Sequence, residues 1–181
     1  SVDSGKNLYP YFRDGSWSTL KHNIKIFKEC ERVNTLVSGI CTTSIYQLMD
    51  LCNVFEDMLT LDVDIIECAM VYTPEYINPG ILMEHFSDEV RKDIDDTRKM
   101  IENSNSKLKE SALKSLAHVE EYMTNHVVEV YNTTKKDAEL NSTERFIKYV
   151  EQSDKLFDKD FNSTFKKYQI NNNNLIRIDK E

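Results

Sequence analysis

Every glycine and every proline of this chain lies at or before Gly80, so residues 81–181 contain neither. These two residue types interrupt regular structure more strongly than any others. A stretch of this length without them is predicted to be helical almost throughout. We therefore expect an all-α fold, a helical bundle with long helices after Gly80. Residues 1–80 should form an N-terminal arm and a first helical region, and residues 81–181 a long-helix region packed with it as one domain.

The first region is expected to contain two helices. Ser16 or Ser18 is suited to cap the first one, and apolar residues follow at the three- and four-residue spacing of a buried helix face. Gly39 comes directly after this stripe and should end the helix. A second helix follows. Residues 61–72 either continue it or form a short strand, and the sequence leaves both alternatives open.

The second region should begin a helix near Ser87. An unbroken helix from there to residue 138 would be about 78 Å long, too long for a domain with a radius of gyration of about 16 Å. We expect a break at residues 103–106, whose short polar side chains compete with the backbone for hydrogen bonds.

Asn141 and Glu144 have the spacing of a capping pair for a last helix, which should end at residues 171–174. Its predicted apolar stripe is Phe146, Tyr149, Val150, Phe157, Phe161, Phe165 and Tyr168.

The charge balance limits the partners. The chain has 31 acidic and 23 basic residues, a net charge of −8. Residues 1–80 are the more acidic part, with 11 acids and 6 bases. Nucleic acids bind to basic surfaces, so a nucleic-acid partner is not expected, and neither is an anionic membrane surface. No run of about 18 apolar residues occurs, so no transmembrane helix is predicted.

Four cysteines, Cys30, Cys41, Cys52 and Cys68, lie within 39 residues. Their spacing contains no C-x-x-C pair of the kind that zinc sites use. Clustered cysteines in even number favour two disulfides, and hence secretion, over free thiols. Folding the first helix back on the second about Gly39 would pair Cys30 with Cys52 and leave Cys41 for Cys68. The other pairing, Cys52–Cys68 with Cys30–Cys41, is less favoured. The bundle is therefore expected to be disulfide-stabilised.

Three sequons are consistent with an extracellular glycoprotein, at Asn132, Asn141 and Asn162. The chain opens without an initiator methionine or an apolar signal region, as expected of a processed chain. The composition alone would produce about two such triplets by chance, so the prediction of secretion depends mainly on the cysteines.

No pattern of residues identifies a reaction. The histidines, at positions 22, 85, 118 and 126, form no H-E-x-x-H motif. The acidic clusters at Asp62 and Asp64, and at Asp93, Asp95 and Asp96, lack the glycine and closing glutamate of a calcium loop. They are interpreted as solvated surface. Neither a G-x-S-x-G motif nor a glycine-rich phosphate loop is present. We expect no catalytic residue, no metal and no cofactor.

The two disulfides expected within residues 30–68, the sequons and the helical region after Gly80 together resemble the helical salivary proteins of blood-feeding insects. Among these, the chain resembles the mosquito group that contains the neutrophil-stimulating and 34-kilodalton salivary proteins. The resemblance is general, with no signature motif, and transfers no functional residue. It implies an injected, immune-modulating protein that binds host molecules.

The leading hypothesis is thus a secreted, non-enzymatic protein that binds another protein through its helical surface. The partner and the binding face stay unknown. The alternative is a carrier that holds a small apolar ligand between helices, suggested by the Phe-rich last helix. Self-association of the region after Ser87 is a third hypothesis.

Overall fold

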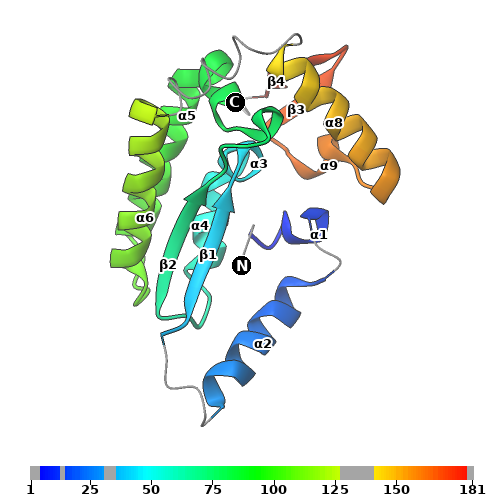
Figure 1. Ribbon diagram of the computed structural model, residues 1–181. Helices are drawn as coiled ribbons and strands as arrows, with labels where there is room; N and C mark the ends of the chain where they lie inside the picture. Colours follow the sequence, from blue (N-terminus) through cyan, green and yellow to red (C-terminus); the bar gives the residue numbers. More distant parts are fainter. Residues whose placement is uncertain (1–4, 13–14, 31–35, 127–140, 179–181) are drawn as a thin grey trace.

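The computed structural model describes residues 5–12, 15–30, 36–126 and 141–178 (Figure 1). Helices predominate, but four strands form two small sheets, so the prediction of an all-α bundle is wrong. Strands β1 (Ser38–Thr43) and β2 (Ile65–Met70) pair in parallel, and β3 (Tyr168–Asn171) pairs antiparallel with β4 (Asn174–Arg177). The helices are α1 (Tyr9–Phe12), α2 (Trp17–Glu29), α3 (Ile45–Met49), α4 (Leu51–Met58), the short η1 (Glu75–Ile77), α5 (Gly80–Glu102), α6 (Lys109–Glu121), the π-helical η2 (Tyr122–His126), α8 (Ser142–Phe157) and α9 (Phe161–Thr164).

The two parallel strands explain where the first region departs from the prediction. Parallel strands need a crossover connection, and α3 and α4 supply it behind the sheet (Figure 1). Ser44 begins α3 with a capping box that includes Gln47. Gly39 lies inside β1 instead of ending a helix, and α2 stops ten residues earlier at Glu29. Within residues 61–72 the β-branched segment forms β2, so the strand alternative holds there.

Helix α6 covers the outer edge of β2. Its Ser111 hydroxyl accepts a hydrogen bond from the Ile66 amide at 3.1 Å, and the Ser115 hydroxyl donates to the Ile66 carbonyl at 2.8 Å. An open strand edge exposes unpaired backbone groups. At Ile66 two serines one helical turn apart satisfy both groups, which joins the sheet to the helical part of the molecule.

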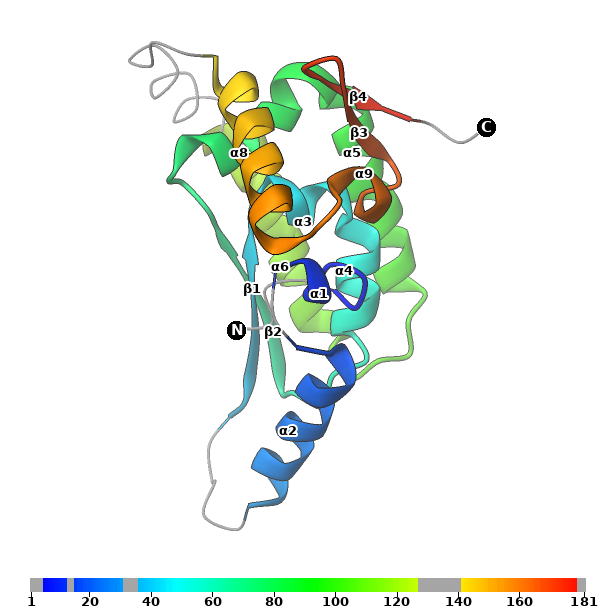
Figure 2. The ribbon, with the colours of Figure 1, turned by 90° about the vertical axis from the view of Figure 1, so that its right-hand side faces the viewer.

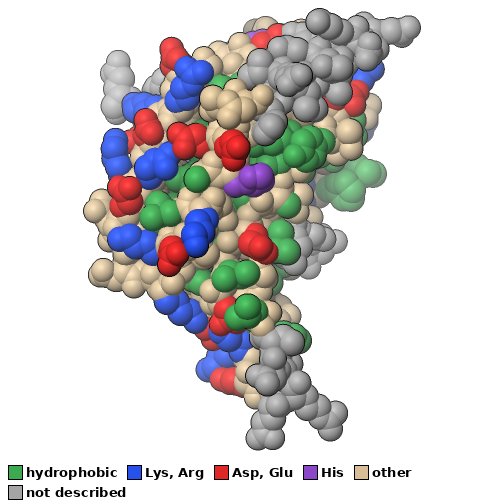
Figure 3. Space-filling view, turned by 60° about the vertical axis from the view of Figure 1, so that its left-hand side comes forward, with side chains coloured by type: hydrophobic (Ala, Val, Ile, Leu, Met, Phe, Trp, Pro, Cys, Tyr) green, Lys and Arg blue, Asp and Glu red, His purple; other side chains and the backbone are tan. Residues whose placement is uncertain are grey.

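The region after Gly80 confirms two predicted features. Helix α5 has a kink at Phe86 (φ −140°, ψ 41°), directly before the predicted start at Ser87. The break at residues 103–106 separates α5 from α6. There the Ser106 amide donates to the Ser104 hydroxyl at 3.1 Å, and the Ser106 hydroxyl donates to the Leu59 carbonyl at 2.9 Å. Acidic and basic side chains alternate over the face that α5 and α6 present (Figure 3).

The predicted last helix is shorter than expected. Asn141 caps α8 as predicted, by accepting from the Thr143 amide. The helix ends at Asp158, a residue with φ 52°, and α9 and the β3–β4 hairpin follow. Asn172 and Asn173 form the hairpin turn with φ of 49° and 59°. Asparagine tolerates this left-handed conformation better than most residues, so the polar run at 171–174 makes a turn between strands.

The core joins residues from both halves of the chain. The apolar stripe predicted for the last helix is partly buried: Phe146, Phe161 and Tyr168 are each at most 2% exposed. Phe161 stacks on Phe165, with ring centroids 4.6 Å apart. The N-terminal arm, residues 5–12, packs across these rings, and α2 extends away from the body (Figure 2).

Gly5 lets this arm approach α4 closely. A Cβ at this position would lie 3.1 Å from the Val54 Cα and 3.2 Å from the Asn53 carbonyl oxygen. Farther along the arm, the Tyr11 hydroxyl donates to Asp154 on α8 at 2.7 Å. The arm therefore connects α4 to α8.

The predicted disulfides are wrong, because all four cysteines are free thiols. Since Gly39 lies in a strand, the first helix does not fold back to bring Cys30 onto Cys52. Cys41 and Cys68 are direct neighbours in the parallel register, but they are not bonded to each other. The free thiols remove the main reason for predicting secretion, which stays a prediction from the sequons.

Alkylation under denaturing, non-reducing conditions should therefore label four thiols per chain, and reduction beforehand should not change that number. Mass spectrometry of the intact protein checks this count. Labelling of only two thiols, with two more appearing after reduction, would contradict the structure.

Candidate functional site

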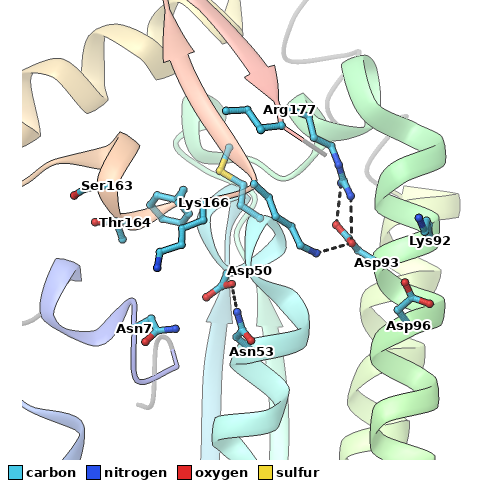
Figure 4. Close-up of a pocket in the computed structure, with 14 residues that line it drawn as sticks. Asn7, Asp50, Asn53, Lys92, Asp93, Asp96, Ser163, Thr164, Lys166 and Arg177 are labelled. Carbon is cyan, nitrogen blue, oxygen red and sulfur yellow. Dashed lines mark hydrogen bonds and ion pairs between the residues drawn. The ribbon is translucent and has the colours of Figure 1, made fainter. Parts of the chain in front are cut away.

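A polar pocket of about 760 Å³ lies where α4, α5 and the C-terminal hairpin meet (Figure 4). Its volume is within the range of small-molecule sites. The N-terminal arm contributes to its wall through Asn7. The other lining residues are Met49, Asp50, Asn53, Lys92, Asp93, Asp96, Ser163, Thr164, Phe165, Lys166, Lys167, Arg177 and Ile178.

Asp93 holds the hairpin against α5. Its carboxylate is buried and accepts from both terminal nitrogens of Arg177, at 2.9 and 3.3 Å, and from Lys167 at 2.8 Å. The guanidinium also donates to the Tyr168 hydroxyl at 2.8 Å. Burial raises the pKa of Tyr168 to about 12, although the nearby Arg177 charge opposes that rise. Paired charges of this kind avoid the large cost of burying a lone ion.

Asp50 is the carboxylate that faces the middle of the pocket. It lies at the junction where α3 ends and α4 begins, and accepts from the Asn53 side-chain amide at 2.6 Å. Burial raises the pKa of Asp50, opposed by that hydrogen bond and by the charge of Lys167. Figure 4 shows its carboxylate facing the space into which the Lys166 side chain extends. Within the described residues, neither lysine is close enough to Asp50 to form an ion pair.

Lys166 brings an unpaired positive charge to the site. Its side chain is exposed and extends into the space bordered by Asn7 and Asp50 (Figure 4). In the described part of the chain it has neither an ion pair nor a hydrogen bond to its ammonium group. The pocket lining thus contains three lysines, Lys92, Lys166 and Lys167, and Arg177, in a chain whose overall charge is negative.

The residues selected from the sequence lie mostly elsewhere. Cys68 lines a second groove of about 550 Å³ between β2 and α6, together with His118. The interaction between the neighbouring Cys41 and Cys68 thiols raises the pKa of Cys41 and lowers that of Cys68, while burial also raises the pKa of Cys41. Cys52 lies on α4 near Lys167, and burial raises its pKa.

The two described sequon asparagines do not line the pocket, although Ser163 and Thr164 of the third sequon do. Asn141 caps α8, and the Asn162 side chain makes two hydrogen bonds with the Ile170 backbone, at 3.1 and 2.8 Å. Asn132 lies outside the described residues. The structure therefore assigns local structural roles to two of the three.

The interpretation of the two acidic clusters as solvated surface is correct for some of their residues and wrong for others. Asp95 and Asp96 are exposed, but Asp93 is buried and paired. Asp64 accepts from the Val37 amide and from Lys28, and both contacts lower its pKa. Among the described residues, no group of three or more His, Cys, Asp or Glu side chains is arranged to hold a metal ion.

No protein-family model, curated protein or solved structure matches this chain. The resemblance to salivary proteins therefore stays a hypothesis from the sequence. None of the helices in the described residues combines the length and hydrophobicity needed to cross a bilayer.

Replacing Arg177 with methionine should lower the free energy of unfolding by about 1.5–3 kcal/mol, because the buried Asp93 loses its hydrogen bonds from Arg177 and keeps only the Lys167 cation. Urea unfolding measures the change. The control is Lys114→Met, which breaks an exposed pair with Glu110 and should have little effect. Equal effects of the two substitutions would show that the Asp93 pair does not hold the hairpin.

Replacing Asp50 with asparagine should stabilise the protein at neutral pH. The raised pKa means that the folded state disfavours the ionised carboxyl. This penalty is present above the raised pKa and disappears as the pH falls below the usual value of about 3.9. Unfolding of both proteins at neutral pH and at about pH 3 tests this, with exposed Asp95→Asn as the control. An advantage that is the same at both pH values would refute the explanation.

Proposed function

We propose that this chain is a non-enzymatic binding protein, and that the pocket between α4, α5 and the hairpin holds a small ligand with an acidic group. The observation that carries the proposal is that Lys166 and Lys167 both line one polar pocket, into which the Lys166 side chain extends (Figure 4). Ammonium groups form strong, charge-assisted hydrogen bonds to carboxylates and phosphates. Within the described residues, the ammonium group of Lys166 has no partner and is available for such a bond.

The site is held ready for the ligand by its neighbours. Asp93 fixes Lys167 through a 2.8 Å contact and fixes the hairpin through Arg177. The backbone next to Lys166 is therefore attached to α5 before any ligand arrives. A preorganised site loses less conformational entropy on binding than a mobile one.

The observation that suggested a carrier of an apolar ligand no longer favours that alternative. The aromatic side chains that suggested it, among them Phe146 and Phe161, pack on each other in the core. They fill space that an apolar ligand would need.

Binding to a protein partner remains a separate proposal. Exposed apolar side chains support it on two helices: Ile26 and Phe27 on α2 are 52% and 51% exposed, and Leu156 and Phe157 at the end of α8 are 75% and 61% exposed. The finer hypothesis, a salivary effector that modulates its host, depends on the sequence resemblance.

Replacing Lys166 with methionine should weaken binding of glutarate or inorganic phosphate about tenfold, because one charge-assisted hydrogen bond is lost. Isothermal titration calorimetry measures the change. The control is Lys148→Met, at an exposed position on α8 outside the pocket. Wild-type protein that binds neither glutarate nor phosphate, or equal affinities of the two variants, would refute the proposal.

A further inference from the structure

The pocket contains an anionic centre as well as a cationic one. Asp50 accepts one hydrogen bond from Asn53 at 2.6 Å, and a carboxylate can accept several. Its remaining acceptor capacity faces the cavity, in the space into which Lys166 also extends (Figure 4). A ligand that reaches Lys166 must therefore also come close to Asp50.

The other carboxylates do not compete for this role. Both oxygens of Asp93 are occupied by Arg177 and Lys167. Asp96 is exposed and lies 3.3 Å from Lys99 on the same helix. Asp50 is thus the acidic side chain of the lining that keeps acceptor capacity inside the pocket.

Two like charges in a partly desolvated site repel each other, and opposite charges attract. A ligand with only negative groups would place one of them near the Asp50 carboxylate. A ligand with an ammonium group beside its carboxylate would direct the ammonium group to Asp50 and its acidic groups to the lysines. The Asp50 carboxylate and the lysine ammonium groups would then each contact an opposite charge of the same ligand.

We infer that the ligand of this pocket is an amino acid or a closely similar zwitterion, with its ammonium group on Asp50 and an acidic group on Lys166. The inference rests on the proposed function, because it needs the pocket to be a binding site. It goes further by naming the ligand class and the residue that selects it. The pocket volume of about 760 Å³ leaves room for a side chain beyond the zwitterionic group.

L-Glutamate and glutarate separate this inference from the proposed function. The two molecules have the same carbon chain and the same two carboxylates, but glutarate lacks the ammonium group. Calorimetry with the wild-type chain should show glutamate binding about tenfold more tightly. Asp50→Asn should reduce that ratio to near one and leave glutarate binding undiminished, whereas Lys166→Met should weaken both ligands.

The control for Asp50 is Asp95→Asn, an exposed acid on α5 outside the pocket, which should leave the ratio unchanged. Glutarate binding as tightly as glutamate to the wild type would overturn the inference while the proposed function stands. A preference for glutamate that survives in Asp50→Asn would also overturn it. Binding of neither ligand would refute the site itself.

Discussion

Asp93 brings a negative charge into the protein interior, and the arrangement of the pocket depends on the pairing of that charge. Arg177 comes from β4 and Lys167 from the residue before β3, so both ends of the hairpin meet α5 at one carboxylate. Moving the hairpin away would leave the charge buried without a partner, which costs more than the loss of a surface contact. The position of Lys166, one residue from Lys167, follows from this constraint.

The other wall depends on the parallel sheet. Its crossover contains two short helices, and Asp50 occupies the junction between them with φ −129° and ψ 30°. A helix that continued through this position would have given the carboxylate a different direction. Buried apolar side chains of α3 and α4 hold the junction, and α6 holds β2 through Ser111 and Ser115. The two walls are thus fixed by different interactions, a charge pair and a packed crossover.

The absence of glycine and proline after Gly80 correctly predicted that helices predominate in this region. It did not predict every position at which the chain reverses direction. The break at residues 103–106 could be placed because length arithmetic required one. The turn at Asn172 and Asn173 could not, since asparagine in the left-handed region replaces the glycine that normally signals a tight hairpin. In the first region, Gly39 was interpreted as a helix stop because periodicity does not distinguish a short apolar strand from a helix segment. Two six-residue strands, paired only with each other, leave little trace in the sequence.

The candidate site could not be predicted, for a related reason. Its charged residues come from α4, α5 and the hairpin, and each resembles ordinary surface in its own segment. Asp93 lies beside two exposed acids and differs from them only by facing the core. A net charge of −8 also hides the local balance, because Lys167 pairs with an acid, Asp93, that is 74 residues away in the sequence. The signal that sequence reasoning could have used is the adjacent lysine pair after a buried aromatic stripe. Its meaning appears only when folding places one lysine on Asp93 and directs the other into the space that Asp50 faces, where no other described residue pairs with it.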